Sequence, residues 1–232
     1  MSRTAIVTGV GSGLGAALVR KLVQEECRVG MFARSETYLT QLSNELGEKA
    51  LPVPTDITKP DQITRGFQQV REAFGPIDIL INHAGNATWA GLMGLENEQF
   101  EQAWRVGPYA SFLCCREAVP DMMKQGGGAI LFSGATSSIR GRGGALAFSS
   151  AKFGVRGLAE SLARELWPKG IHVAHVIIDG EIGSQTEKGA DTREPVLNPD
   201  AMAQSYWNLI TQDGSAWTME LDLRPHQEEF FV

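Results

Sequence analysis

The feature of this sequence that most constrains its fold lies near its start, where an apolar run leads into a glycine-rich turn. Ala5–Val7 is typical of a strand buried on both faces of a sheet. The glycines that follow can adopt positive φ and let a ligand approach the backbone. The amphipathic run Ala16–Val23 predicts a helix whose unpaired N–H groups and positive dipole end point at that turn. This order of elements predicts a pyrophosphate site and therefore a dinucleotide-binding protein.

The glycine spacing Thr8-Gly9-x-x-x-Gly13-x-Gly15 resembles the cofactor motif of the short-chain dehydrogenase/reductase family. The resemblance covers nearly the whole chain. It implies a nicotinamide cofactor, a small-molecule carbonyl or alcohol substrate, and assembly into a homodimer or homotetramer. It places the following residues of the turn at the cofactor: Gly9, Gly11, Ser12, Gly13, Leu14 and Gly15.

Composition limits the other classes of function. The 232 residues are 43% hydrophobic, which suits one α/β domain over residues 1–232. The net charge of −6, without a run of Lys or Arg, argues against nucleic acid or an anionic membrane as partner. The first predicted strand begins close to Met1, so we expect no signal peptide. Cys27, Cys114 and Cys115 lack metal-ligand spacing, so we expect buried reduced thiols, no metal site and a cytoplasmic location.

Strand-like and helix-like segments alternate along the chain without repeats or linkers. This alternation predicts a single Rossmann-type, doubly wound parallel sheet with helices on both faces. The predicted strands after the first cover residues 28–33, 50–53, 77–81, 129–133, 171–178 and 217–223. The predicted helices after the first cover residues 35–46, 61–74, 96–124 with a break near Gly107-Pro108, 148–167 and 202–211.

The end of the second strand bears on the choice of cofactor. In the family a carboxylate there holds the ribose hydroxyls of NAD, whereas here Ala33 takes that position and Arg34 follows. A guanidinium suits a phosphate in charge and geometry, so we expect NADP(H) to be favoured over NAD(H). The resemblance assigns Asp56 and Ile57 to the adenine. Alternatively, Asp56 caps the helix that follows.

Two further turns resemble cofactor contacts. Asn82-His83-Ala84-Gly85 is similar to the family's Asn-Asn-Ala-Gly turn, which implies that Asn82, Ala84 and Gly85 lie at the cofactor. His83 replaces the second asparagine and could supply a proton or only preserve a structural hydrogen bond. After the strand at 171–178, the resemblance assigns Gly180, Ile182 and Ser184 to the nicotinamide. Asp179 and Glu181 either place negative charge near that ring or face water.

The catalytic positions depart from the family pattern. The family uses Tyr-x-x-x-Lys on one helix, with an upstream serine and an asparagine. At the corresponding positions this chain has Phe148, Lys152, Ala135 and Gly107, so only Lys152 is retained. A phenylalanine has no proton to donate. Spacing singles out no substitute among Thr136, Ser137, Tyr109, His83 and a bound water.

These observations predict an NADP(H)-binding protein whose oxidoreductase activity is weak, atypical or absent. One alternative is an active NAD(P)-dependent oxidoreductase that uses a substitute proton donor near Thr136. Another is a non-catalytic structural subunit with an empty cleft. The polar segment 183–200 has no clear period, and the resemblance places the lid and much of the substrate pocket there.

Overall fold

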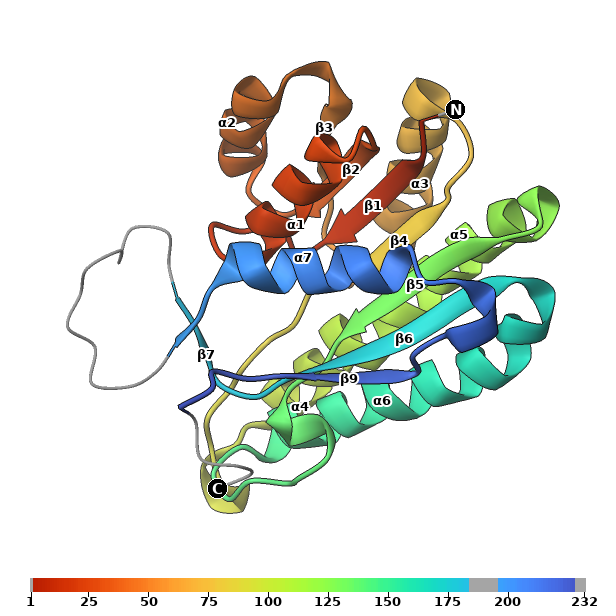
Figure 1. Cartoon of the computed structure of the whole chain (residues 1–232). Helices are drawn as coiled ribbons and strands as arrows, with labels where there is room; N and C mark the ends of the chain where they lie inside the picture. The colour runs from red at the N-terminus through yellow and green to blue at the C-terminus, as the bar shows by residue number, and fades with distance from the viewer. Residues whose placement is uncertain (1, 184–195, 228–232) are drawn as a thin grey trace.

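A parallel sheet runs through the centre of the computed structural model, which describes residues 2–183 and 196–227. Its seven strands are ordered β3-β2-β1-β4-β5-β6-β9 (Figure 1). The order reverses between β1 and β4, as in doubly wound folds. The predicted fold class is therefore confirmed. The strands are β1 Thr4–Thr8, β2 Arg28–Ala33, β3 Ala50–Pro54, β4 Ile79–Asn82, β5 Gly128–Ser133, β6 Ile171–Ile178 and β9 Glu220–Leu223.

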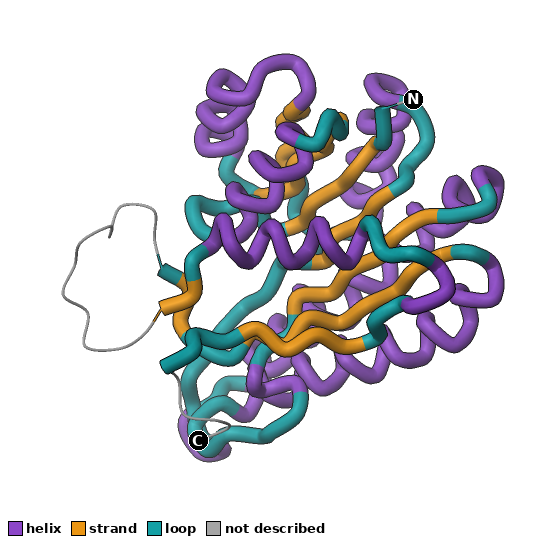
Figure 2. The backbone as a smooth tube through the Cα atoms, in the orientation of Figure 1, coloured by secondary structure: helices purple, strands orange, loops and turns teal. Residues whose placement is uncertain are grey.

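Helices cover both faces of the sheet (Figure 2). One core lies beneath α1, α2 and α7, and the other lies beneath α3, α5 and α6. Within the described ranges, no helix is both long and apolar enough to cross a bilayer. The helices are α1 Leu14–Gln24, α2 Glu36–Leu46, α3 Pro60–Phe74, α4 Asn97–Trp104, α5 Ala110–Gln125, α6 Leu146–Leu166 and α7 Pro199–Ile210.

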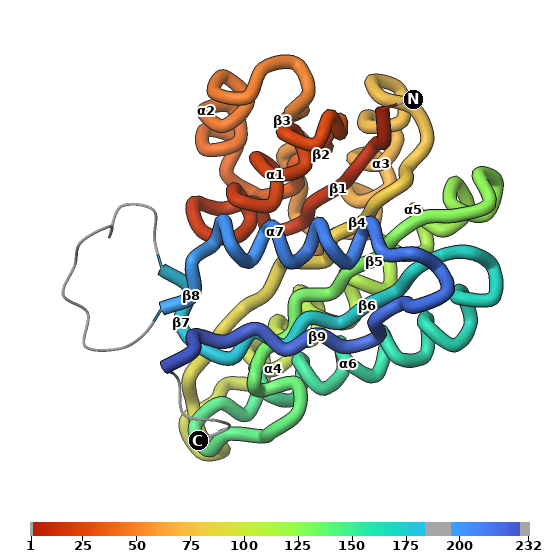
Figure 3. The backbone as a smooth tube through the Cα atoms, viewed as in Figure 1, coloured from red at the N-terminus to blue at the C-terminus, as the bar shows by residue number. Residues whose placement is uncertain are grey.

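A small two-stranded ribbon stands beside the carboxyl edge of the sheet. It pairs β7, Glu181–Ile182, with β8, Val196–Leu197, in parallel (Figure 3). The predicted lid segment 183–200 overlaps this ribbon, but most of that segment lies outside the described residues.

Most predicted elements agree with the structure to within two residues. The helix predicted at 202–211 begins three residues earlier, at Pro199, and the last strand is shorter than predicted. It begins at Glu220 rather than at residue 217. Trp217 stacks on the His172 ring instead, with centroids 4.8 Å apart and an interplanar angle of 2°. The indole therefore packs on the end of the sheet, and strand pairing starts three residues later.

The long helical region at 96–124 is interrupted where the sequence predicts it. Residues Arg105–Tyr109 form a π-helical turn with Pro108 inside it. Proline lacks the N–H that a regular helix needs, so the widened turn absorbs the missing bond. Gly107 lies in this turn against α6, where a Cβ would lie 3.5 Å from the Ala151 Cβ. The break thus brings α4 and the π-helical turn against α6, the helix that carries Lys152.

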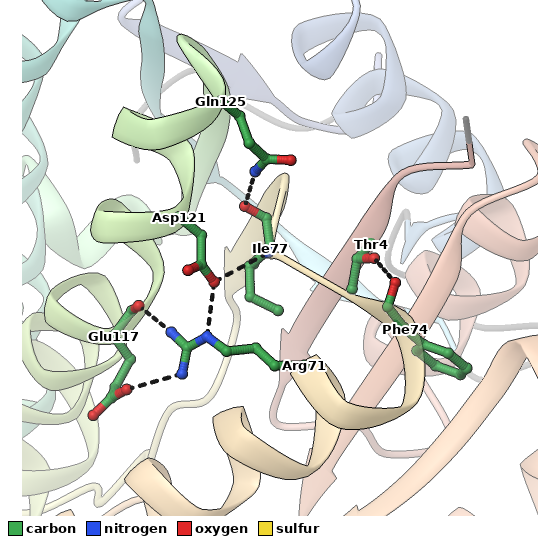
Figure 4. A network of polar contacts seen from close by, with 7 residues as sticks. All are labelled: Thr4, Arg71, Phe74, Ile77, Glu117, Asp121 and Gln125. Carbon is green, nitrogen blue, oxygen red and sulfur yellow. Dashed lines mark hydrogen bonds and ion pairs between the residues drawn. The ribbon is translucent and has the colours of Figure 1, made fainter.

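Arg71 joins α3 to α5 at the amino edge of the sheet (Figure 4). Its Nε donates to Asp121 Oδ2 at 2.8 Å, and its Nη1 pairs with Glu117 Oε2 at 3.3 Å. Asp121 also accepts the Ile77 N–H at 3.2 Å. This network anchors the approach to β4 at the end opposite the candidate site.

Candidate functional site

A cavity of about 680 Å³ opens at the carboxyl ends of the first strands, beside the point where the strand order reverses. Open α/β sheets bind ligands at this position because the loops on either side diverge there. The cavity is lined by Gly9, Val10, Gly11, Phe32, Ala33, Arg34, Ser35, Thr55, Asp56, Ile57, Thr58, His83, Ala84, Gly85, Asn86, Ala87, Gln102, Val106 and Phe148.

The glycines of the first turn have two different roles. Gly9 has φ +75°, and a Cβ there would lie 2.6 Å from the Ala84 Cα. A Cβ on Gly15 would lie 2.7 Å from the Gly9 carbonyl oxygen. Gly11 and Gly13, in contrast, would meet no atom within 4 Å. Gly9 and Gly15 therefore permit close backbone packing, while Gly11 and Gly13 leave space for a ligand.

The amino end of α1 is open to an anionic ligand. Gly13 is its N-cap, and no side chain caps the helix among the residues described. Leu14 and Gly15 begin the helix, and Ser12 is exposed just before it. The first N–H groups and the positive end of the helix dipole thus face the glycine turn.

Thr8 holds the turn after β4 against β1. Its Oγ1 accepts the N–H groups of His83 at 3.1 Å and Ala84 at 3.3 Å, and it donates to the Ile81 carbonyl. Thr8 has no predicted role from the sequence, although its position directly before Gly9 is a signal that could have suggested one.

Arg34, Asp56 and Ile57 line the same end of the cavity. Asp56 Oδ1 accepts hydrogen bonds from the N–H of Thr58 at 3.0 Å and from its hydroxyl at 2.7 Å. These bonds lower the pKa of Asp56. The N-cap of α3 is Lys59. The alternative that Asp56 caps the next helix is therefore wrong, because its carboxylate orders the loop before that helix.

Lys152 and Phe148 lie one turn apart on α6. Lys152 Nζ donates to the Ser133 carbonyl oxygen at 2.8 Å and lies 5.6 Å from the centre of the Phe148 ring. A Cβ on Gly85 would be 3.6 Å from Nζ, so the amine borders the cavity turn. Burial lowers the pKa of Lys152 to about 8. The Phe148 ring lines the cavity and packs on Trp89, with centroids 5.6 Å apart.

The remaining predicted catalytic positions lie outside the cavity lining. The Thr136 hydroxyl donates to Asp179 Oδ1, and Asp179 Oδ2 lies 3.0 Å from Arg224 Nη1. Asp179 is buried at 7% exposure, so the expectation that it faces water is wrong. Its charge is balanced by Arg224 inside the protein, whereas Glu181 is exposed. The Ala135 N–H donates to Ser138 Oγ at 3.0 Å.

A chain of hydrogen bonds connects His83, after β4, through Ser133 at the end of β5 to Tyr206 on α7. His83 Nδ1 lies 3.0 Å from Ser133 Oγ, which lies 2.7 Å from the Tyr206 hydroxyl. Burial, with a smaller effect of the Lys152 charge, lowers the pKa of His83 to about 4. Burial also raises the pKa of Tyr206. Tyr206 is fully buried and does not line the cavity, so its phenol does not take the place of the absent tyrosine.

Several predicted cofactor positions are not part of the cavity lining, namely Ser12, Gly13, Leu14, Gly15, Asn82, Lys152, Gly180 and Ile182. Asn82 is buried, and its Nδ2 lies 3.7 Å from the Cys115 sulfur. Gly180 and Ile182 lie at the turn after β6 and in β7. Ser184 lies outside the described residues. Cys114 and Cys115 are buried, which confirms the prediction of buried thiols, and burial raises the pKa of both.

Comparisons with known proteins agree with this geometry. The family model for short chain dehydrogenase matches residues 3–194. A ketoacyl reductase of Nostoc sp. is 30% identical over 197 residues, which cover 82% of this chain and 67% of that protein.

Two solved structures are also similar. A short-chain dehydrogenase from Rhodopseudomonas palustris has a TM-score of 0.83 at 33% identity, with 97% of this chain and 99% of that chain covered. A metagenomic short-chain oxidoreductase in complex with NADP has a TM-score of 0.84 at 28% identity, with 97% and 98% covered. The chain therefore belongs to the short-chain dehydrogenase family of NAD(P)-dependent oxidoreductases.

Proposed function

We propose that this protein binds NADP(H) in the cavity at the carboxyl edge of the sheet and has weak oxidoreductase activity toward ordinary carbonyls and alcohols. The observations that carry the proposal are the open space at Gly11 and Gly13 before the uncapped start of α1, and the Phe148 ring in the cavity lining. Phe148 stands where the family pattern has the proton donor. The structurally similar oxidoreductase in complex with NADP supports the choice of cofactor.

The residues present fit a dinucleotide. A side chain at Gly9 or Gly15 would clash with neighbouring backbone atoms and distort the turn. The uncapped start of α1 offers N–H groups to a pyrophosphate. Arg34 would hold the additional phosphate of NADP(H), with Asp56 and Ile57 at the adenine. Ala84 and Gly85 would pass beneath the riboses. Lys152 would hold the ribose hydroxyls on the nicotinamide side, with the turn at Gly180 and Ile182 at the nicotinamide.

The bound cofactor would supply or accept a hydride. The chain must then provide or remove a proton, and a positioned acid or base typically contributes ~10²–10⁴-fold to the rate. Phe148 has no proton to donate. Gly107 lacks the side-chain amide of an asparagine, and Ala135 lacks the hydroxyl of a serine. Thr136 would have to release Asp179 before its hydroxyl could serve. In this proposal the low activity results from the missing donor and not from poor cofactor binding.

The test restores the missing groups. We expect the double variant Phe148→Tyr with Ala135→Ser to reduce a panel of small carbonyls with NADPH on the order of 10²-fold faster than the unmodified protein. Phe148→Leu with Ala135→Ser is the matched control, because it changes the same two positions without adding a phenol, and it is expected to leave the rate low. Wild-type turnover equal to that of the double variant would contradict the proposal, because a phenol would then be unnecessary.

We also propose that the chain forms a homodimer or homotetramer through the face made by α4, α5 and α6. Large apolar side chains are exposed there, namely Phe100, Trp104, Tyr109, Phe112 and Phe153. Exposed apolar area of this kind is typical of protein interfaces. Light scattering of Phe112→Arg should show a smaller species than the wild type.

A cytoplasmic location is also part of the proposal, because free, buried thiols are consistent with a reducing compartment.

A further inference from the structure

We propose that Tyr206 and Ser133 hold His83 as the neutral tautomer protonated on Nε2, and that this N–H donates a hydrogen bond to an acceptor oxygen of the nicotinamide dinucleotide. The inference rests on the proposed function for its ligand. The tautomer itself follows from contacts within the chain. Tyr206 and Ser133 are positioning residues, since they act through His83.

The direction of the hydrogen bonds follows from Tyr206. Its side chain is fully buried, and its hydroxyl has Ser133 Oγ as its partner among the described residues, at 2.7 Å. A buried hydroxyl proton without an acceptor costs about 1–3 kcal/mol in general. The phenol proton is therefore directed at Ser133 Oγ.

Ser133 must then pass its own proton onward. A serine hydroxyl has one proton and two acceptor lone pairs. Since Ser133 Oγ accepts from Tyr206, its proton is free to point at His83 Nδ1, which is 3.0 Å away. The reverse order, in which Nδ1–H donates to Ser133 and Ser133 donates to Tyr206, leaves the phenol proton without an acceptor. If Ser133 Oγ accepted from both Tyr206 and Nδ1–H, the buried Ser133 proton would have no acceptor among the described residues. Nδ1 is therefore the acceptor nitrogen of the imidazole.

A neutral imidazole whose Nδ1 accepts carries its proton on Nε2. The ring remains neutral near pH 7 because burial lowers the pKa of His83 to about 4, helped by the neighbouring Lys152 charge. His83 lines the cavity, and its Nε2 has no hydrogen-bond partner among the residues described. The His83 Nε2–H is therefore a fixed, uncharged hydrogen-bond donor at the wall of the cavity.

This donor is held rigidly at the cavity wall. The His83 backbone N–H is bound to Thr8 Oγ1 at 3.1 Å, and the ring is bound through Ser133. Ser133 also accepts Lys152 Nζ on its carbonyl oxygen at 2.8 Å. One residue at the end of β5 thus orients both the imidazole and the amine. The two side chains are expected to hold neighbouring oxygens of the same ligand.

The first experiment measures the tautomer without any ligand. Nitrogen-15 NMR of histidine-labelled protein should show His83 Nε2 as the protonated nitrogen and Nδ1 as the unprotonated one. Tyr206→Phe should convert this pattern into a mixture, because the Ser133 hydroxyl can then accept as well as donate. Tyr38→Phe, a tyrosine on α2, should leave the pattern unchanged. Observation of Nδ1 as the protonated nitrogen in the wild type would overturn the inference.

The second experiment measures NADPH binding by fluorescence titration. Loss of a fixed hydrogen-bond donor is expected to weaken binding by about 2- to 10-fold in Ser133→Ala and Tyr206→Phe. His83→Ala should lose the same amount, and His83→Gln, which keeps an N–H donor, should recover part of it. Wild-type affinity in all three disrupted variants would overturn the inference alone. A wild-type protein that binds no nicotinamide nucleotide would overturn the proposed function as well.

Discussion

Lys152 and Phe148 occupy the two positions of α6 where the family pattern has its catalytic lysine and tyrosine. Their spacing of one helical turn places an amine and a phenyl ring on the same side of α6, 5.6 Å apart. In the family pattern a lysine cation lowers the pKa of an adjacent tyrosine phenol. Here the Lys152 amine lies over the face of the Phe148 ring instead. The amine keeps its place because it is bound to the Ser133 carbonyl, which does not depend on the missing hydroxyl.

The charge of Lys152 predicts how cofactor binding responds to pH. Its pKa is lowered to about 8, so Nζ is charged below that pH and becomes neutral above it. NADPH is an anion, and a charged donor binds it more strongly than a neutral one. Titrations from pH 7 to pH 9 should therefore show weakening affinity, on the order of tenfold. Lys152→Met should bind weakly at every pH, whereas the exposed Lys169→Met should follow the wild type. A flat wild-type profile would contradict this role.

His83 predicts how stability responds to acid. Its pKa is about 4 in the folded protein and near 6.5 when unfolded, because burial disfavours the charged ring. The unfolded state therefore binds more protons between these values, and stability is lost as pH falls from about 7 towards 4. Urea unfolding of the wild type should show a steeper loss over this range than His83→Asn. Parallel curves for the two proteins would mean that the ring is already charged or exposed in the folded state.

At the scale of elements, local signals predict the residues that we propose for cofactor binding, whereas non-local contacts form the rest of the candidate site. The turn between β1 and α1, the position of Arg34 after β2 and the Phe148–Lys152 spacing all depend on residues close in sequence. The Ser133–Tyr206 bond joins positions 73 residues apart, and the Thr136–Asp179 bond joins positions 43 apart. Neither contact can be read from periodicity, because each depends on how α7 and β6 pack against β5.

The glycine turn offers a matched pair of substitutions. Gly9 has positive φ and no room beside Ala84, whereas Gly11 faces open space. Gly9→Ala should lower the free energy of unfolding by about 1–3 kcal/mol because the backbone must strain or move. Gly11→Ala should leave stability nearly unchanged. Thermal denaturation of both variants is the measurement, and equal melting temperatures would show that the turn tolerates a side chain at Gly9.

The α3–α5 connection offers a second matched pair. Arg71 is partly buried and bonded to both Glu117 and Asp121, whereas Arg65 pairs with Asp61 at the surface. Arg71→Met should destabilise the protein by about 1–3 kcal/mol, since two carboxylates lose their partner. Arg65→Met should cost about 0–0.5 kcal/mol. Chemical denaturation distinguishes the two, and a similar small cost in both would show that the buried network contributes little.

At the scale of the whole molecule, the two ends of the sheet differ in what they carry. At the amino ends of the strands the Arg71 network joins α3 to α5. At the carboxyl ends the cavity lies beside the reversal of strand order. The predicted fold depends only on the alternation of strands and helices, so it does not require Tyr, Ser and Asn at the positions where the family pattern has them. A fold of this kind can therefore keep its nucleotide cradle while its proton chemistry changes.

The most direct test of cofactor binding is a titration of the purified protein with NADPH and with NADH, in which the fluorescence of the nucleotide is measured. We expect saturable NADPH binding with a Kd below about 1 mM, in the usual range for such ligands. Binding should be tighter than for NADH, and Arg34→Ala should remove the difference. If neither nucleotide changes its fluorescence at millimolar concentration, the cavity is not a nicotinamide nucleotide site and the central claim is contradicted.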